Sequence, residues 1–259
     1  MLITHTSLKF NFHFFLGLIL TLVFNPLLGQ TQIGQDLDGT WSNEYFGASV
    51  SSPDRHTVAA GGTGFNINKG RARVYSWYNG TWTQKGYDIV GEQSGERSGC
   101  SISMPNANSI AIGAYAHLPA GTVRIHSWNG NSWAQKGSDI DGEAIYDNSG
   151  WSVSTPDSNT VAIGAPYNDG NGYLSGHVRV HIWNGSSWAQ KGSDIDGEAI
   201  NDQSGQSVSM PDSNTVAIGA PYNDGNGANS GHVRVYSWNG SSWAQKGSDI
   251  DGEAINDQS

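Results

Sequence analysis

The sequence predicts an all-β protein made of tandem four-stranded units, and three observations carry this prediction. The segment 136–190 aligns without gaps on 191–245 and is identical to it at 47 of 55 positions. No segment has the 3.6-residue apolar period of an amphipathic helix. One glycine recurs at spacings of 52, 51 and 55 residues, at Gly61, Gly113, Gly164 and Gly219. Repeated four-stranded units of about 40–50 residues are typical of a β-propeller, whose sheets, called blades, pack face to face.

The last complete copy illustrates the four expected strands of a unit, which we name A, B, C and D in chain order. Both faces of strand B are apolar or small, which suits a strand that is covered on both sides, whereas the mostly polar strand D suits an outer edge. Asn239 and Gly240 supply the positive φ angles that a tight C–D hairpin needs. The expected strands cover about 205–210, 215–220, 232–238 and 243–250.

The copies cover about 32–84, 85–135, 136–190 and 191–245, and a partial fifth copy covers 246–259. The segment 32–38 repeats the end of the last strand D, so we expect it to be a donated strand that closes the ring onto the last blade. Because the fourth copy already has its own strand D, we expect four blades of a larger ring in a truncated chain. A closed four-bladed ring with a C-terminal tail is the alternative.

Residues 1–30 differ from the rest of the chain and predict a secretory signal peptide. Lys9 is their only charged residue, Phe14 to Phe24 is an apolar run, and Asn25-Pro26 ends it. The run is shorter than the ~20 residues that span a bilayer. We therefore expect cleavage near residues 29–31, a secreted or cell-surface protein and no membrane insertion of the mature chain. An uncleaved membrane anchor is the alternative.

The formal charge of −10, with only 14% charged residues, argues against nucleic acid as a partner, because such binding needs a basic surface. Charged disordered chains and long coiled coils are excluded by the same composition.

Short motifs in register with the repeat resemble the FG-GAP repeat, the blade unit of integrin-α-like propellers. Phe46-Gly47 matches its first signature, and Gly164-Ala165-Pro166 and Gly219-Ala220-Pro221 match its second. The resemblance covers about 32–259 and implies a seven-bladed propeller of bacterial type, secreted or at the cell surface, used for adhesion or other binding. Many members bind calcium in an acidic loop, but the corresponding stretch here, 207–215, has only one carboxylate, so we do not expect that site.

An acidic stretch recurs at the end of strand D and could bind calcium through its oxygens. It could equally be a solvated edge that discourages aggregation, or it could pair with arginines that recur in strand C. We assign no metal or other cofactor site from the sequence and keep calcium as an open alternative. The acidic residues of the third copy are Asp194, Asp196, Glu198 and Asp202, and the arginines are Arg73, Arg124, Arg179 and Arg234.

The strand directions place the D–A and B–C loops on one face of the blades and the A–B and C–D turns on the other. Copies three and four differ at eight positions, and five of these lie in or beside the D–A and B–C loops. Loops on a rigid scaffold commonly carry binding sites, and aromatic side chains suit them. The predicted ligand-binding residues are Tyr146, Asn148, Trp151, Tyr173 and Leu174. Neutral drift in exposed loops would produce the same pattern.

No catalytic set is recognisable, so we do not expect an enzyme. The polar residues that break the repeat have no nucleophile–base or metal-ligand spacing. The single cysteine, Cys100, stands where other copies have alanine, tryptophan or glutamine, and we interpret it as having no chemical role. The tryptophan pairs that flank each C–D hairpin are interpreted as packing. The repeat-breaking polar residues are His56, His117, Glu44, Glu96 and Arg97.

Three functions remain after these exclusions. The first is a non-enzymatic binding or adhesion module whose partner is an extracellular protein or glycan. The second is a structural spacer of a larger surface protein. The third is a propeller-type hydrolase or lyase whose site lies outside this stretch.

Overall fold

The computed structural model describes residues 32–258, which fall into two compact units divided between Ile33 and Gly34. The predicted signal peptide, residues 1–30, lies outside the described residues. Within 32–258, no helix is both long and apolar enough to cross a membrane. All of the strands and the one helix lie in the second unit, within 34–258.

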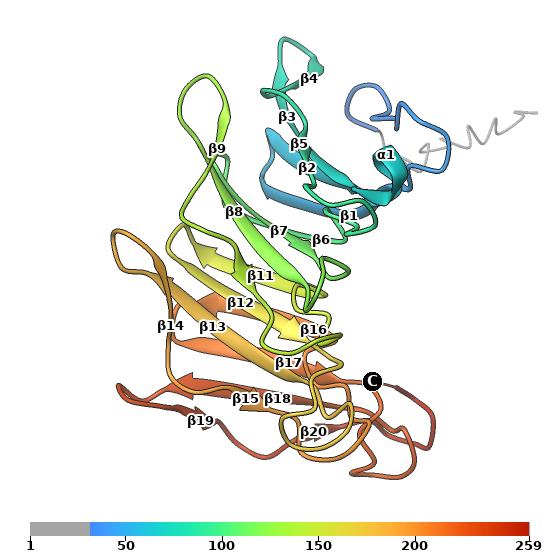
Figure 1. The fold of residues 1–259 in the computed structure, drawn as a ribbon, viewed down its shortest axis with the longest axis vertical. Coiled ribbons are helices and arrows are strands. Elements are labelled where there is room, and N and C mark those ends of the chain that lie inside the picture. Colours follow the sequence, from blue (N-terminus) through green and yellow to red (C-terminus); the bar gives the residue numbers. More distant parts are fainter. Residues whose placement is uncertain (1–31, 259) are drawn as a thin grey trace, which may run out of the picture. The chain divides into compact units, whose positions relative to one another are not determined.

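Four antiparallel sheets follow one another along the chain as the blades of a β-propeller (Figure 1). In each sheet strand A pairs with strand B, and B pairs with C. The A strands are β1 (Phe46–Asp54), β6 (Ser101–Asn106), β11 (Ser152–Asp157) and β16 (Ser207–Asp212). The B strands are β2 (Thr57–Gly62), β7 (Ser109–Ala114), β12 (Thr160–Ala165) and β17 (Thr215–Ala220).

Strands B and C of the fourth sheet have the predicted bounds, but strand A begins two residues later than expected. Gly205 has a φ of 88° and so cannot be extended strand. The C strands are β3 (Arg71–Tyr78), β8 (Thr122–Trp128), β13 (His177–Trp183) and β18 (His232–Trp238). A four-residue helix, α1 (Phe65–Asn68), lies in the first B–C loop.

Strand D is divided into two pieces in every sheet, whereas the sequence predicted one continuous strand. Both pieces pair with strand C. The first pieces are β4 (Thr81–Gln84), β9 (Trp133–Gln135), β14 (Trp188–Gln190) and β19 (Trp243–Gln245). The second pieces are β5 (Ile89–Val90), β10 (Ile140–Asp141), β15 (Ile195–Asp196) and β20 (Ile250–Asp251).

The division of strand D lets its middle segment pack on the next sheet. Trp238 and Trp243 of the fourth sheet have ring centroids 5.5 Å apart. The Trp243 Nε1 group donates a 2.7 Å hydrogen bond to the carbonyl oxygen of Lys191, and the Lys191 ammonium lies 5.2 and 5.3 Å from the two ring centroids. Gly192 lies so close to both rings that a side chain there would collide with them. The tryptophans are therefore packing residues between blades, as predicted.

The segment 34–38 belongs to none of the four described sheets, and the later blade that it was expected to complete is not among them, so its role as a donated strand stays a prediction. It contains no strand, and Gly34 lies against Trp77 and Trp82 of the first sheet. The side-chain amide of Gln35 donates to the Trp82 carbonyl oxygen (2.9 Å). The segment packs on the sheet that follows it, as the equivalent segment before the fourth sheet does.

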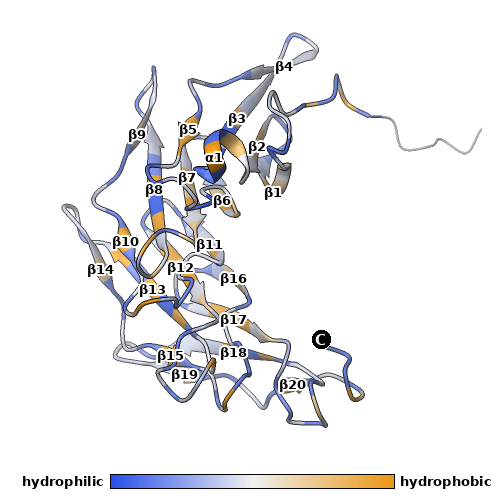
Figure 2. Cartoon of the chain, turned by 45° about the vertical axis from the view of Figure 1, so that its right-hand side comes forward, coloured by the Kyte–Doolittle hydropathy of each residue, from blue (hydrophilic) through white to orange (hydrophobic). Residues whose placement is uncertain are grey.

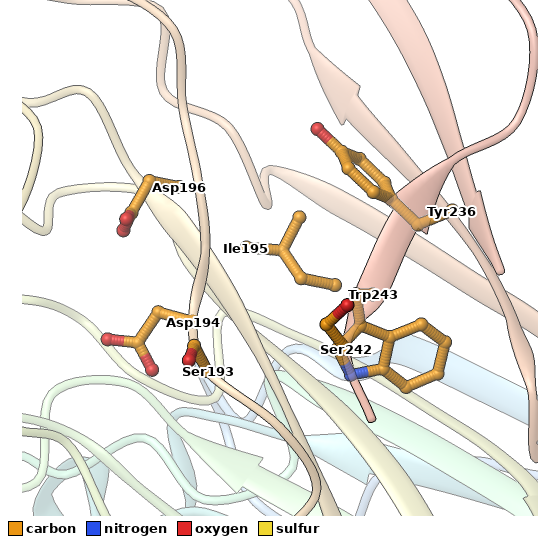
Figure 3. A pocket seen from close by; sticks show the side chains of 7 residues that line it. All are labelled: Ser193, Asp194, Ile195, Asp196, Tyr236, Ser242 and Trp243. Atoms are coloured by element: carbon orange, nitrogen blue, oxygen red, sulfur yellow. The ribbon is translucent and has the colours of Figure 1, made fainter. Parts of the chain in front are cut away.

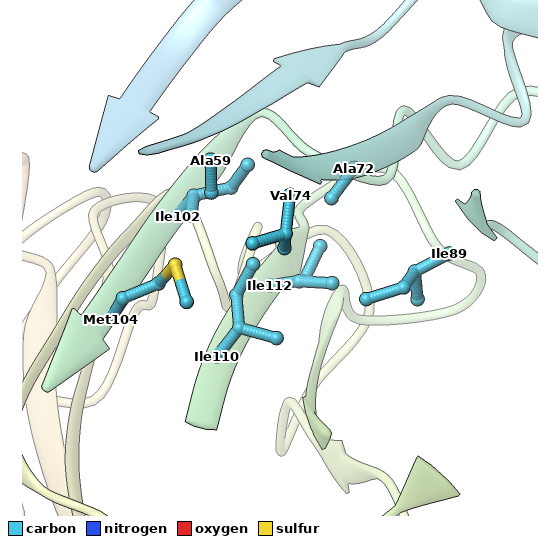
Figure 4. Packing of buried hydrophobic residues seen from close by; sticks show 8 residues of the cluster. All are labelled: Ala59, Ala72, Val74, Ile89, Ile102, Met104, Ile110 and Ile112. Atoms are coloured by element: carbon cyan, nitrogen blue, oxygen red, sulfur yellow. The ribbon is translucent and has the colours of Figure 1, made fainter. Parts of the chain in front are cut away.

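The hydrophobic cores lie between consecutive sheets. Figure 4 shows Val74 of the first sheet packed against Ile110 and Ile112 of the second, with Met104 beside them. Figure 2 shows hydrophobic residues along the strands of each sheet. Both faces of strand B are buried in the second and third sheets, as predicted.

The A strands carry the main contacts from sheet to sheet, in the order β1, β6, β11 and β16. Among the described strands no comparable contact joins β16 to β1, so these four sheets do not close a ring. Where two consecutive sheets meet, which we call the seam, their backbones lie very close together. A Cβ on Gly164 would lie 2.0 Å from the carbonyl oxygen of Gly205, in the next sheet. The equivalent Gly219 meets only Ser207 of its own sheet.

Candidate functional site

The D–A and B–C loops lie together and form one surface, which we call the loop face. In the third sheet the backbone N–H of Gln203 donates to the carbonyl oxygen of Leu174 (3.1 Å), and that of Asn201 donates to Tyr173 (2.9 Å). Both bonds recur in the first and fourth sheets, and in the second the N–H of Tyr146 donates to Pro119, so each loop pair is held by main-chain hydrogen bonds. The loop face comprises the D–A loops 91–100, 142–151, 197–206 and 252–258 and the B–C loops 63–70, 115–121, 166–176 and 221–231.

The predicted binding residues lie on the loop face, but in two consecutive loop pairs. Tyr146 is 72% exposed and its N–H donates to Pro119 in the B–C loop of the second sheet (3.0 Å). Tyr173 is 63% exposed and, with Leu174, lies beside the next D–A loop. The two pairs are joined where the N–H of Tyr167 donates to the carbonyl oxygen of Asp147 (3.3 Å).

Trp151 is half-buried and packs between two tyrosines from consecutive sheets. Its ring centroid lies 4.8 Å from that of Tyr115 in the second sheet and 5.9 Å from that of Tyr167 in the third. The Trp151 N–H donates to Asn148 (3.1 Å), which places the half-buried Asn148 in the turn before strand A. Trp151 therefore lies at the edge of the loop face and also packs the second sheet against the third.

Three of the predicted residues have left-handed backbone conformations. The φ angles are 72° at Tyr146, 57° at Asn148 and 52° at Leu174. Asparagine tolerates this region better than other residues with a side chain, and the fourth copy has asparagine at the positions of Tyr146 and Leu174. The third copy thus carries two large side chains at positions that disfavour them, and strain of this kind gathers at functional sites.

Exposed aliphatic residues extend the apolar surface of the loop face, and the sequence reasoning missed them. Three of them, Ile145, Ile200 and Ile255, recur at one position of the repeat, so a comparison of copies hides them, whereas Ile67 and Leu118 lie in the diverged first and second copies. The sequence did contain a signal for the isoleucines: each stands in an otherwise polar loop that lacks the alternating apolar pattern of a strand. These residues are Ile67, Leu118, Ile145, Ile200 and Ile255, all more than 60% exposed.

Buried carboxylates fix the D–A loops through hydrogen bonds. Asp147 accepts the N–H of Ala144 (2.9 Å) and the side-chain amide of Asn168 (3.0 Å). Asp202 makes the same two bonds in the next copy. Both carboxylates are therefore satisfied, and their hydrogen bonds help to fix the position of the D–A loops.

Two of the polar residues that break the repeat, Glu96 and His117, come together. The His117 Nδ1 and Glu96 Oε2 atoms are 2.6 Å apart, and Arg124 contacts the same carboxylate (2.8 Å). Burial alone would raise the pKa of Glu96, but the hydrogen bonds from Arg124 and His117 outweigh it and lower that pKa. The other ring nitrogen of His117 lies 3.1 Å from the amide of Gln93, so both nitrogens have structural neighbours.

The side chains or backbones of the other three polar residues have other partners. Glu44 accepts a hydrogen bond from Arg71 (2.6 Å). Arg97 donates to the hydroxyl of Tyr115 (2.7 Å), and the His56 N–H caps a turn by donating to Asp54.

The recurring acidic stretch has different partners in different sheets. Asp88 and Asp139 form ion pairs with Arg73 (2.9 Å) and Arg124 (2.8 Å), as one of the sequence alternatives predicted. In the third copy, Figure 3 shows Ile195 pointing toward the next sheet while the flanking carboxylates point the other way. The single carboxylate of the stretch 207–215, Asp212, accepts the N–H of Asn214 (2.7 Å) and so caps a turn.

Cys100 lies in a seam between sheets. Its thiol donates to the carbonyl oxygens of Gly113 (3.2 Å) and Gly150 (3.4 Å). Burial raises the pKa of the thiol to about 11, so it is protonated at neutral pH. A protonated, half-buried thiol is a poor nucleophile, which supports the interpretation that Cys100 has no chemical role.

These features define a β-propeller module whose loops form an apolar, rigidly held surface on one face. Residues 191–236 match the family model of the FG-GAP repeat. The third copy is nearly identical to that segment, so the chain carries FG-GAP repeats folded as propeller blades, as the resemblance predicted. No curated protein matches the sequence.

Two solved structures are similar to this chain. Their sequence identities to it are low, so the similarity is evidence about the fold alone. A putative 6-phosphogluconolactonase from Bacteroides uniformis has a TM-score of 0.54 at 12% identity, over 79% of this chain and 55% of that chain. The β-propeller domain of the Trilobed protease from Pyrococcus furiosus has a TM-score of 0.45 at 11% identity, over 80% of this chain and 58% of that chain. The present chain therefore spans little more than half the length of either structure.

Proposed function

We propose that residues 34–258 form a non-enzymatic binding module of a secreted or cell-surface protein, which binds an extracellular protein through the loop face. The observation that carries this proposal is the apolar surface around Tyr146 and Tyr173. Both rings are largely exposed, and the aliphatic side chains of Ile145 and Ile200 lie in the same two pairs of loops. Exposed apolar surface on a soluble module favours a partner that covers it.

The composition of the surface favours a protein over a glycan. Aliphatic side chains outnumber aromatic ones among its exposed large residues, with Leu118, Ile145, Ile200 and Ile255 beside the two tyrosines. Sugar rings stack on aromatic platforms framed by hydrogen-bonding groups, whereas mixed aliphatic and aromatic surface is typical of the centre of a protein interface.

A binding role without catalysis is supported by the partners of the buried polar groups. Glu96 accepts hydrogen bonds from Arg124 and from the backbone N–H of Glu92, and His117 lies within hydrogen-bond distance of the same carboxylate. The thiol of Cys100 donates to backbone carbonyls. These groups have structural partners, and they do not form a nucleophile–base pair.

The test is a screen of the labelled chain against arrays of extracellular proteins and of glycans. We expect binding to at least one protein, with an affinity that Tyr173→Ala lowers at least ten-fold, or about 1.4 kcal/mol. The fourth copy has alanine at this position, so the fold accepts the change. Tyr78→Ala is the matched control, because Tyr78 is 70% exposed on the opposite face, beside a C–D hairpin.

The same screen distinguishes the alternatives. Binding only to glycans would contradict the partner class. Binding that is lost in Tyr78→Ala and kept in Tyr173→Ala would place the site on the opposite face. Absence of any ligand on either array would favour a structural spacer.

A further inference from the structure

The first residue of strand C differs among the sheets, although its surroundings recur. An aspartate of the D strand segment lies beside this strand in every copy. The residue is Arg71, Thr122, His177 and His232 in chain order, and the aspartate is Asp88, Asp139, Asp194 and Asp249.

In the first two sheets a guanidinium group neutralises the aspartate. Asp88 pairs with both Arg71 and Arg73 in the first sheet. Asp139 pairs with Arg124 in the second (2.8 Å). The carboxylate therefore faces a positive charge in each of these sheets.

In the last two sheets the corresponding arginine turns away from the aspartate. Arg234 donates to the carbonyl oxygen of Asp196 in the preceding sheet (2.7 Å) and lies 3.2 Å from Glu198. Arg179 makes the same kind of backbone contact with Asp141 (2.6 Å). The place that Arg71 fills with a cation in the first sheet is here filled by a histidine.

The histidine and two carboxylates converge on one point. The His232 Nδ1 atom lies 3.8 Å from an Asp249 oxygen and 3.9 Å from a Glu198 oxygen. These distances are too long for hydrogen bonds. The His232 side chain is 1% exposed, and neither of its ring nitrogens has a hydrogen-bond partner. Such an unpartnered buried group is uncommon and needs an explanation.

The third sheet repeats the arrangement with Glu143, His177 and Asp194. His177 Nδ1 lies 3.8 Å from an Asp194 oxygen, and its Nε2 atom is buried without a partner. In both clusters one ligand atom from each of the three residues lies within 4.8 Å of the other two. The carboxylates are partly exposed, so an ion can enter and the side chains can move toward it.

We propose that each of these two clusters binds one divalent transition-metal ion of the zinc class. An imidazole nitrogen with two carboxylate oxygens is a ligand set that zinc accepts, whereas calcium and magnesium take oxygen ligands. Bonds of about 2.0–2.2 Å to the ion place ligand atoms roughly 3.3–3.5 Å apart. The ligand atoms of each cluster lie within 4.8 Å of one another, so they need to approach by at most about 1.5 Å. Water completes the coordination on the exposed side.

The ion would connect consecutive blades. Glu198 lies in the loop that follows β15 of the third sheet, whereas His232 and Asp249 belong to the fourth. Glu143 likewise follows β10 of the second sheet and meets residues of the third. Metal binding at these seams therefore couples to the packing of one sheet on the next.

The test is a calorimetric titration of the EDTA-treated, dialysed chain with zinc chloride, with cobalt absorption spectra as a second measurement. We expect two zinc ions per chain and a melting temperature that rises with zinc but not with calcium. His177→Thr and His232→Thr should each leave one ion, and the double variant none. Threonine is chosen because Thr122 occupies the same position in the second sheet. Circular dichroism of the metal-free variants checks that they fold.

His126→Tyr is the matched control and should keep both ions, because Tyr236 occupies the same position in the fourth sheet. Cobalt should give absorption bands that disappear only in the double histidine variant. Zinc binding that survives in that folded variant, or the absence of zinc binding to the original chain, would overturn the proposal. A calcium-induced stabilisation equal to that of zinc would overturn the assigned class of ion.

Discussion

Tyr146 and Asn201 occupy the same position in consecutive copies and have nearly the same left-handed φ angles, 72° and 68°. The third copy therefore keeps a bulky side chain where the fourth has the residue that suits the backbone. A left-handed conformation costs a residue with a Cβ roughly 1–2 kcal/mol, and asparagine less. The same relationship holds for Leu174 and Asn229, with φ angles of 52° and 49°.

Replacing Tyr146 and Leu174 by asparagine should stabilise the chain. Each change relieves local backbone strain, so we expect a gain of about 0.5–1 kcal/mol per site. Chemical denaturation followed by tryptophan fluorescence measures this gain. Asn201→Tyr is the reverse control and should lower the stability by a similar amount. Equal stabilities of the original chain and the asparagine variants would show that the backbone is not strained there.

The seam glycines should differ in their tolerance of a side chain. A Cβ on Gly164 would lie 2.0 Å from the backbone oxygen of Gly205, which cannot move without separating two sheets. We expect Gly164→Ala to cost about 3 kcal/mol or more in the free energy of unfolding.

Gly219→Ala is the matched control, because the only close contact of a Cβ there is with the movable hydroxyl of Ser207. Its cost should be below about 1 kcal/mol. Similar costs at Gly164 and Gly219 would contradict the close approach of the backbones.

The recurrence of small and apolar residues was sufficient to predict strands B and C, since both faces of those strands are covered. The division of strand D could not be predicted in the same way. It depends on where Lys191 and Gly192 meet Trp238 and Trp243 of another sheet, which is a tertiary contact. The packing of Gly34 on Trp77 and Trp82 is likewise a tertiary contact.

The candidate site was predicted in part for a related reason. Tyr146 and Tyr173 break the repeat and could be found by comparing copies. Ile145 and Ile200 recur, so their exposure is visible only in the structure. The histidine clusters join three segments that are distant in the sequence, and only folding brings them together.

Acid should destabilise the chain through His126. Its pKa is lowered to about 4, chiefly because burial disfavours the charged ring and also because Arg124 repels it; Asp139 acts in the opposite direction. Asp88 of the preceding sheet lines the same pocket. Since the folded pKa is below the unfolded value of about 6.5, the unfolded state binds more protons between these values, and stability falls as pH falls from about 6.5 to 4. The loss attributable to His126 is up to about 3 kcal/mol.

His126→Tyr should reduce this acid sensitivity, as Tyr75 and Tyr236 occupy the same position in other sheets. Unfolding free energies at pH 7 and pH 4.5 for both proteins measure the difference. An unchanged difference between the two pH values would contradict the assignment.

Cys100 should react slowly with thiol reagents. A pKa of about 11 in place of 9.0 lowers the thiolate fraction near pH 8 by about 100-fold. Reaction with an aromatic disulfide reagent should therefore be at least that much slower in the folded chain than in urea. Cys100→Ala should change the stability little, since Ala48 occupies the same position in the first copy. Equal reaction rates in the folded and unfolded chains would contradict the raised pKa of the Cys100 thiol.

The most direct test of the binding proposal measures both the fold and the affinity of a single variant. Five substitutions convert the loop face of the third copy to that of the fourth: Tyr146→Asn, Asn148→Gln, Trp151→Gln, Tyr173→Ala and Leu174→Asn. For a protein ligand found in the array screen, surface plasmon resonance should show at least a ten-fold loss of affinity, while circular dichroism shows an unchanged fold. Full affinity in this folded variant would contradict the claim that the loop face is the binding surface.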